Sequence, residues 1–221
     1  MENFTYAHND TSNGERNTVT AQFNKPRLSP KIKAVRGEAF KAEIPVSNDE
    51  TLNFLITLVC ALKPLNVLEL GTAVGASGAV MLENCPSAHL TTIERDENFY
   101  NAARENFAAL GLCNRVTLIC GDAGKEIEKL DGGFDFIFLD CAKAQYIKYL
   151  PRLKSLLKKG GVLVADDVLL YGYVTGEAET PKKRKMLVQH IKEYINAVTT
   201  DEALATTVLN VGNGVALSVK L

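Results

Sequence analysis

The sequence has few cysteines and no long apolar run, and both absences limit what the protein can be. Its five cysteines (Cys60, Cys85, Cys113, Cys120 and Cys141) form no CxxC pair, so neither a zinc site nor a disulfide framework is predicted. No run of about 18 apolar residues is present, which argues against a transmembrane helix. The N-terminus lacks the basic start and apolar core of a signal peptide. We therefore expect a cytoplasmic protein with no membrane partner.

An excess of charge of one sign is also lacking, because 25 Lys and Arg residues stand against 26 Asp and Glu residues, for a net charge of −1. This balance excludes a protein whose whole surface attracts nucleic acid. A local basic run remains at KKRK (182–185), followed by Lys192. That run fits the exposed first turn of a helix, and it also fits a patch for phosphate groups.

The length of 221 residues and the hydrophobic content of 46% predict one globular domain with a substantial core. We place this domain at residues 29–221. Residues 1–28 are rich in Asn, Thr, Ser and Asp and have few large apolar side chains. They therefore predict a loose N-terminal arm.

Short apolar runs alternate with helical stretches along the domain, a pattern typical of a parallel sheet with helices on both faces. The predicted strands cover 66–70, 89–94, 115–120, 134–140 and 161–166, and the predicted helices cover 49–62, 76–84, 97–110, 123–130 and 146–158. The C-terminal segments 205–211 and 215–221, joined by Gly212, Asn213 and Gly214, predict an antiparallel hairpin. The expected fold class is α/β.

Candidate ligand-binding residues follow the predicted strands, at the sheet edge where open α/β sheets bind their ligands. After the first strand, Glu69, Gly71, Thr72 and Gly75 lie in an E-x-G-x-x-x-G segment, whose glycines let the backbone approach a ligand closely. A dinucleotide dehydrogenase would need the tighter G-x-G-x-x-G, which brings a helix N-terminus onto a pyrophosphate. The wider spacing suits a nucleoside without phosphate, and S-adenosylmethionine is such a ligand.

Two acidic residues extend this candidate nucleoside site. Glu94 ends the second strand, where its carboxylate can accept hydrogen bonds from a ribose diol. Asp122 follows the third strand, where it can accept from an adenine amine while the amide of Ala123 faces a ring nitrogen. Either acid alone could be a helix N-cap. Their combination with the glycine segment favours a nucleoside site.

Three aspartates follow the fourth and fifth strands, namely Asp140, Asp166 and Asp167. Their charges would repel one another and raise their pKa values unless a cation were present. Oxygen ligands of this kind match Mg²⁺, with Mn²⁺ and Ca²⁺ as alternatives, although exposed helix caps would give the same pattern. Lys143 lies three residues past Asp140. A bound cation would push it toward its neutral form, in which it could act as a general base, whereas otherwise it would be a surface lysine.

These segments together resemble the metal-dependent O-methyltransferases of the catechol and caffeoyl-CoA type. The resemblance covers roughly residues 44–221 and rests on VLELGTAVGAS (67–77), TTIERD (91–96), GDA (121–123), FIFLDCAKAQY (136–146) and GGVLVADDVLLYG (160–172). It implies a Rossmann-like class I methyltransferase fold, in which a seven-stranded, mostly parallel sheet has an antiparallel last strand. It also implies S-adenosylmethionine as the methyl donor and a homodimer as the assembly.

The resemblance also assigns roles to individual residues. It puts the donor near Ser47, the Gly71 loop, Ser77, Glu94, Asp122, Ala123 and Asp140. It assigns the metal to Asp140, Asp166 and Asp167, and the catalytic base to Lys143. Two positions depart from the family pattern. Asp167 stands where Asn is usual, which adds a negative charge to the metal site, and Cys141 stands where Ala is common.

Within this family the chain is similar to the bacterial tRNA 5-hydroxyuridine methyltransferases. The similarity rests on AKAQY (142–146), DDVLLYGYV (166–174), the basic run, IKEYINAV (191–198) and VLNVGNGVALSVK (208–220). It implies methylation of 5-hydroxyuridine at the tRNA wobble position to 5-methoxyuridine, and the basic run would then contact phosphates. A small catechol-like or phenylpropanoid acceptor is the alternative. A donor-binding protein without turnover is a third hypothesis.

Overall fold

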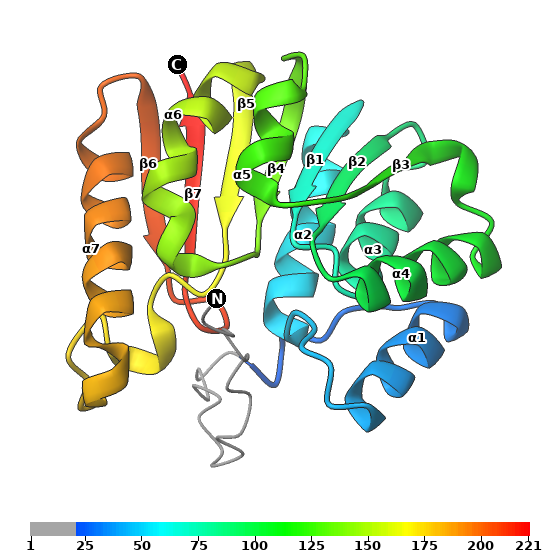
Figure 1. Ribbon diagram of the computed structural model, residues 1–221, viewed down its shortest axis with the longest axis horizontal. Helices are drawn as coiled ribbons and strands as arrows, with labels where there is room; N and C mark the ends of the chain where they lie inside the picture. Colours follow the sequence, from blue (N-terminus) through cyan, green and yellow to red (C-terminus); the bar gives the residue numbers. More distant parts are fainter. Residues whose placement is uncertain (1–20) are drawn as a thin grey trace.

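The computed structural model describes residues 21–221 and contains one seven-stranded sheet (Figure 1). The strands are β1 (Asn66–Leu70), β2 (His89–Glu94), β3 (Val116–Cys120), β4 (Phe134–Leu139), β5 (Leu157–Ala165), β6 (Leu204–Leu209) and β7 (Val215–Lys220). Their order across the sheet is β3-β2-β1-β4-β5-β7-β6. β7 runs antiparallel to both of its neighbours, and the pairs among β1 to β5 are parallel. The predicted parallel sheet and the C-terminal hairpin are confirmed.

Seven α-helices occur in the described part of the chain. They are α1 (Pro30–Lys41), α2 (Asp49–Leu62), α3 (Ala76–Asn84), α4 (Glu97–Ala109), α5 (Ala123–Glu126), α6 (Tyr146–Leu156) and α7 (Lys185–Thr200). α2 shows why the sequence folds this way, because Asn48 caps its first turn and Leu52, Leu55 and Val59 are buried on one face. None of the helices in residues 21–221 combines the length and apolar content needed to cross a membrane.

The structure corrects several predicted boundaries. α1 was not predicted, because it buries only Ile32, Arg36 and Ala39 and so has a weak apolar pattern. α7 was not predicted beyond a first turn, although its residues Val188, Ile191, Tyr194 and Val198 are buried at helical spacing. The helix expected at 123–130 ends at Glu126 and continues as a 3₁₀ turn, and β5 begins four residues before the predicted strand. Residues 1–20, most of the predicted arm, lie outside the described residues.

Helices cover both faces of the sheet, as the sequence pattern predicted (Figure 1). On one face, Leu68, Ile137 and Leu163 are buried together with apolar residues of α6 and α7. On the other face, side chains such as Phe136 and Val162 are buried together with apolar residues of α2, α3 and α4. Because successive strand residues point to opposite faces, these two layers fix the register of every central strand.

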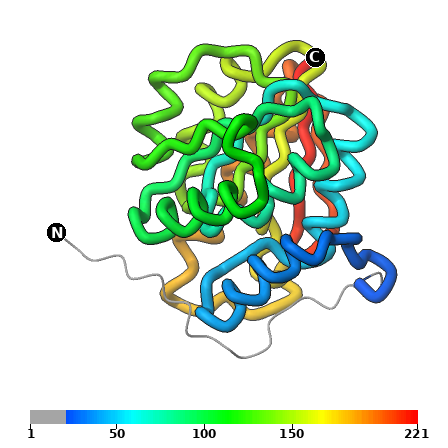
Figure 2. Tube along the Cα trace, turned by 90° about the vertical axis from the view of Figure 1, so that its right-hand side faces the viewer, coloured from blue at the N-terminus to red at the C-terminus, as the bar shows by residue number. Residues whose placement is uncertain are grey.

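The carboxyl ends of β1, β4 and β5 hold three loops side by side. The amide of Asp140 donates to the carbonyl of Leu70 at 2.9 Å, and the amide of Asp166 donates to the carbonyl of Leu139 at 3.0 Å. β1 lies between β2 and β4, the point at which strand order reverses and ligands bind in such sheets. α1 and the loop after β5 lie at this same end of the sheet, as Figure 2 shows from the side.

Candidate active site

A cluster of charged side chains forms where β4 and β5 end. The Nζ atom of Lys143 lies 2.7 Å from Oδ1 of Asp140 and 3.0 Å from Oδ2 of Asp167. All three side chains are largely buried, with 19 to 23% of each exposed. Lys143 begins a 3₁₀ turn three residues past Asp140, and its ammonium lies back against that carboxylate. The structure therefore brings together the predicted base and two predicted metal ligands.

Asp166, the third predicted metal ligand, is almost fully buried, with 2% of the residue exposed. Its Oδ1 accepts hydrogen bonds from the Thr51 hydroxyl at 3.2 Å and from the Asp167 amide at 2.8 Å. Burial raises the pKa of Asp166 well above its ordinary value, and the charges of Asp167 and Asp140 raise it further. Ionisation of the Asp166 carboxyl group is therefore unfavourable, because too little positive charge surrounds it.

The positive charge of Lys143 partly offsets the negative charge of the three aspartates. Burial disfavours its ammonium, but the carboxylates of Asp140 and Asp167 outweigh that effect and raise the pKa of Lys143 well above its usual value. Three carboxyl groups share one ammonium, and such an oxygen-rich donor set fits a hard divalent cation. As the side chains stand, however, no three His, Cys, Asp or Glu residues within 21–221 are arranged to hold a metal. Lys143 lies between two of the candidate ligands, so the predicted cation site is not preformed.

The loop after β1 is fixed by acidic side chains from β1 and β2. Oε2 of Glu94 accepts a hydrogen bond from the amide of Ala73 at 2.8 Å, and its Oε1 accepts from the amides of Arg95 and Asp96. The structure thus places Glu94 directly against the glycine segment. A carboxylate has further lone pairs, so the predicted contact with a ribose is still available to it.

Glu69 lies under the same loop and belongs to a chain of hydrogen bonds. Its carboxylate accepts from the hydroxyls of Ser77 at 2.6 Å and Thr92 at 2.7 Å, and the hydroxyl of Thr92 lies 2.5 Å from that of Thr72. Glu69 and Thr72 are almost fully buried, with 0 and 1% exposed. In this structure both residues orient the loop from beneath.

The remaining predicted donor residues lie around this edge. The hydroxyl of Ser47 donates to Oδ2 of Asp140 at 3.2 Å, which links the segment before α2 to the charged cluster. Asp122 is exposed and caps α5 by accepting from the amide of Lys125 at 3.2 Å, the N-cap role that the sequence also allowed. Ala123 is the first residue of that helix. The predicted donor residues therefore lie on the loops that follow β1, β2, β3 and β4 and on the segment before α2.

Comparison with known proteins decides the family. The model of a family described as O-methyltransferase matches residues 22–221. The chain belongs to the O-methyltransferase family. It is an S-adenosylmethionine-dependent O-methyltransferase of the caffeoyl-CoA and catechol type, and the fold implied by the sequence resemblance is confirmed.

Three proteins illustrate the relationship. The catechol O-methyltransferase of Mycobacterium tuberculosis is 29% identical over 154 residues, which cover 68% of this chain and 70% of that protein. A Staphylococcus aureus structure, assigned as a caffeoyl-CoA O-methyltransferase, has a TM-score of 0.80 and 32% identity over 88% of this chain and 93% of its own. The methyltransferase PaMTH1 of Podospora anserina, solved with S-adenosylhomocysteine, has a TM-score of 0.82 and 23% identity over 91 and 92% of the two chains. This third likeness shows the fold alone.

Several residues that position the methyltransferase site were missed by sequence reasoning. Thr51 lies 115 residues from its partner Asp166. The Tyr146 hydroxyl donates to the carbonyls of Leu139 and Asp166 and so joins the ends of β4 and β5. Arg36 of α1 donates to the carbonyl of Ser47 at 3.0 Å. No local pattern reveals these contacts, because each one depends on how distant elements pack.

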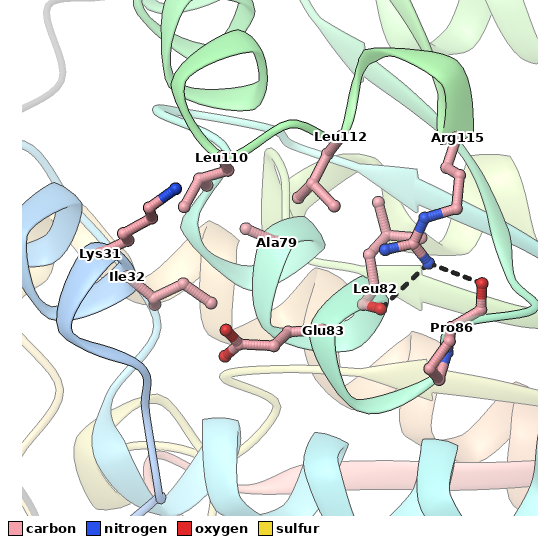
Figure 3. A pocket seen from close by; sticks show the side chains of 9 residues that line it. All are labelled: Lys31, Ile32, Ala79, Leu82, Glu83, Pro86, Leu110, Leu112 and Arg115. Atoms are coloured by element: carbon pink, nitrogen blue, oxygen red, sulfur yellow. Dashed lines mark hydrogen bonds between the residues drawn. The ribbon is translucent and has the colours of Figure 1, made fainter.

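A hollow of about 330 Å³ lies away from this site, between α1, α3 and the end of α4 (Figure 3). Ile32, Leu82 and Leu112 are among its lining residues. The Arg115 guanidinium at its edge donates to the carbonyls of Leu82, Cys85 and Pro86, as the dashed lines in Figure 3 show for two of them. Because Arg115 is used to cap the end of α3, we assign no chemistry to this hollow.

Gly71 is the glycine that the active site requires most strictly. It has a φ of +100°, and a Cβ atom there would lie 2.1 Å from the carbonyl oxygen of Asp140. We expect Gly71→Ala to cost more than the roughly 1–3 kcal/mol of left-handed strain alone, because backbone must also move. Gly111→Ala is the matched control, with a φ of +73° and nothing within 4 Å. Urea unfolding of both variants checks this, and equal losses would contradict the clash.

Glu69 makes the stability of the methyltransferase depend on pH. Burial raises the pKa of Glu69 to about 7, and the hydrogen bonds from Ser77 and Thr92 offset part of the rise. Because the folded-state pKa lies above the unfolded value, this contribution to stability is complete below the unfolded pKa and is lost as pH rises through about 7. We expect Glu69→Gln to remove this loss.

Thermal unfolding tests this expectation between about pH 5 and pH 8, a range that includes the folded-state pKa of Glu69. At the upper end Glu69→Gln should be more stable than the wild type by up to about 3 kcal/mol. Glu105→Gln, at an exposed position of α4, is the control and should follow the wild-type curve. Parallel curves for the wild type and Glu69→Gln would show that Glu69 does not titrate in this range.

Proposed function

We propose that this methyltransferase transfers a methyl group to the 5-hydroxyl of 5-hydroxyuridine at the tRNA wobble position, which forms 5-methoxyuridine. The observation that carries the proposal is a basic, aromatic segment against the charged cluster. Tyr171 lies four residues past Asp167, in a turn in which the amide of Leu170 donates to the carbonyl of Asp167 at 3.3 Å. The Arg184 guanidinium carbon lies 5.9 Å from the centre of the Tyr171 ring.

The basic run at the start of α7 supports an RNA acceptor. Lys182, Lys183 and Lys185 are exposed, and Arg184 of the same run lies over Tyr171, four residues past Asp167. Phosphate groups provide most of the affinity in nucleic-acid binding and need such cations, whereas a small phenol does not. A local cationic edge also agrees with a net charge near zero, because only this edge would meet the RNA.

We further propose that Asp140, Asp166 and Asp167 hold a divalent cation, with Mg²⁺ expected and Mn²⁺ and Ca²⁺ as alternatives. The oxygen donor set and the raised pKa of Asp166 support this, since both indicate a deficit of positive charge. When bound, the cation would polarise the acceptor hydroxyl as a Lewis acid. For these ligands to be released, the ammonium of Lys143 has to leave its present position between Asp140 and Asp167.

Lys143 is the proposed general base. With two carboxylates against it the amine stays protonated, so it can accept a proton only when another cation neutralises those carboxylates. The neutral amine would then take the proton of the acceptor hydroxyl at its Nζ atom. The Gly71 loop, Glu94 and Asp122 would orient the donor, because methyl transfer needs the acceptor oxygen in line with the methyl group.

A small catechol-like or phenylpropanoid acceptor is the second candidate function. The names of the Mycobacterium tuberculosis and Staphylococcus aureus relatives support it. Such an acceptor would use the same carboxylates and Lys143 but would leave the basic run without a role. The homodimer and the cytoplasmic location expected from the sequence stay predictions.

Methylation in vitro separates the two acceptors. The enzyme is incubated with S-adenosylmethionine, Mg²⁺ and either tRNA that contains 5-hydroxyuridine or a panel of catechols, and the products are measured by mass spectrometry. We expect conversion of 5-hydroxyuridine to 5-methoxyuridine and no reaction with tRNA that lacks the hydroxyl. Methylated catechols together with unchanged tRNA nucleosides would reject the tRNA acceptor.

A further inference from the structure

Arg184 differs from its neighbours in the basic run. Lys182, Lys183 and Lys185 are exposed, whereas Arg184 is half-buried at the start of α7. Its guanidinium carbon lies 5.9 Å from the ring centre of Tyr171 and 6.0 Å from that of Tyr173. The two rings are 6.2 Å apart and inclined by 62°. One cation of the run therefore lies over two aromatic rings that follow Asp167 in the chain.

The segment that carries the tyrosines is firmly placed. The amides of Val168 and Leu169 donate to the carbonyls of Gly214 and Asn213 in the turn between β6 and β7, both at 2.9 Å. Leu170 and Tyr171 have φ values of +45° and +58°, which residues with side chains seldom adopt. Strained backbone of this kind persists where the surroundings fix it, and such positions gather at functional sites.

The guanidinium of Arg184 has unused hydrogen-bonding capacity. Within residues 21–221 it takes part in no ion pair and donates no hydrogen bond, and its contacts are with the two tyrosine rings. Guanidinium carries five N–H donors in a planar fork that matches phosphate oxygens, and it can stack on aromatic rings at the same time. Its orientation is thus set in advance, while its donors remain available to an anion.

We propose that Arg184, oriented by Tyr171 and Tyr173, binds a phosphate that flanks the target nucleoside and thereby selects an RNA acceptor over a free phenol. This inference rests on the proposed tRNA methylation and adds its specificity-determining residue. The phosphate and the target hydroxyl lie on one nucleotide chain. A guanidinium held over Tyr171, four residues past Asp167, would therefore favour an acceptor whose hydroxyl belongs to a polynucleotide.

The test uses the full-length enzyme and variants Arg184→Gln and Arg184→Lys. Arg104→Gln is the matched control, because Arg104 lies over Tyr100 at 6.0 Å on α4, on the other side of the molecule from α7 (Figure 1). Binding of hydroxylated tRNA is measured by fluorescence anisotropy over a range of salt concentrations, and methylation kinetics are measured on the same tRNA. Thermal unfolding of each variant checks that the fold is kept.

We expect Arg184→Gln to weaken tRNA binding by about tenfold or more, the weight of one charge-assisted hydrogen bond. The slope of log affinity against log salt should become shallower by about one, and KM should rise more than kcat falls. Arg184→Lys should keep the wild-type salt slope but not the affinity, because an ammonium lacks the planar fork. Arg104→Gln should resemble the wild type.

Two failures can be told apart. If the wild type methylates hydroxylated tRNA but Arg184→Gln matches Arg104→Gln in affinity and salt slope, then the role of Arg184 is wrong and the tRNA function stands. If the wild type neither binds nor methylates the tRNA, the proposed function fails and this inference fails with it. A loss of kcat with unchanged KM and salt slope would also overturn phosphate binding by Arg184.

Discussion

Replacing Asp166 by asparagine is expected to lower kcat/KM by about a thousandfold, which corresponds to roughly 4 kcal/mol of transition-state stabilisation. The variant keeps the size of the side chain but removes one of the three carboxylates proposed to hold the cation. An amide oxygen is a weaker and uncharged ligand for a hard cation. The loss should therefore appear both in turnover and in cation affinity measured by calorimetry.

Asp166→Asn should not harm the fold. Burial and the neighbouring carboxylates raise the pKa of Asp166, so its ionisation near neutral pH works against folding when no cation is bound. In metal-free buffer the variant is expected to melt no lower than the wild type. Loss of activity without loss of stability would show that Asp166 serves the reaction and does not stabilise the fold.

Asp135→Asn is the control, because it is expected to lower stability and to leave activity unchanged, the opposite of Asp166→Asn. Burial opposes the charge of Asp135, but Lys158 and the amides of Asn66 and Leu65 outweigh it and lower the pKa of this carboxyl. Its contribution to stability is present above the unfolded pKa and is lost as pH falls through the folded value. This variant should be less stable at neutral pH yet fully active.

Full activity of Asp166→Asn would contradict the proposed role of the Asp166 carboxylate in holding the cation.

Lys143→Met is expected to abolish base catalysis and to strengthen cation binding. General bases contribute about 10²- to 10⁴-fold in rate, so kcat should fall within that range. The same variant removes the ammonium that lies 2.7 Å from Asp140 and 3.0 Å from Asp167. Mg²⁺ should then bind about tenfold more tightly, because it no longer displaces an ion pair worth roughly 1.4 kcal/mol.

Calorimetric titration with Mg²⁺ alone measures the second effect without any turnover. Lys148→Met, at an exposed position of α6, is the control and should leave both cation affinity and kcat unchanged. Weaker Mg²⁺ binding in Lys143→Met would mean that the amine helps to hold the cation. Unchanged binding together with full turnover would show that Lys143 is neither a base nor a competitor for the site.

The sequence predicted the sheet well, because buried strands carry dense apolar runs that end in polar residues. FDFIFLD shows this, since Phe134–Leu139 forms β4 and Asp140 follows at the sheet edge. Once parallel strands were inferred, their carboxyl ends had to meet, so Asp140, Asp166 and Lys143 could be placed near one another without a structure. α1 was not foreseen, because Ile32 is the one large apolar side chain among its three buried residues.

The sequence could not show how the site is held. Thr51 reaches Asp166, and Arg184 lies over two tyrosines, only because helices and loops far apart in the chain pack together. Nor could it show that Lys143 lies between Asp140 and Asp167 in this structure, since the balance of one ammonium against several carboxylates depends on distances of a few ångströms. Spacing identified the participants, and packing sets their roles.

The dependence of methyl transfer on a divalent cation tests the central claim most directly. Wild-type enzyme is treated with chelator, supplied with S-adenosylmethionine and hydroxylated tRNA, and titrated with Mg²⁺ while labelled 5-methoxyuridine is measured. The account predicts no transfer in chelator, full recovery at saturating Mg²⁺ and no recovery in Asp166→Asn. Undiminished formation of 5-methoxyuridine in chelator would contradict it.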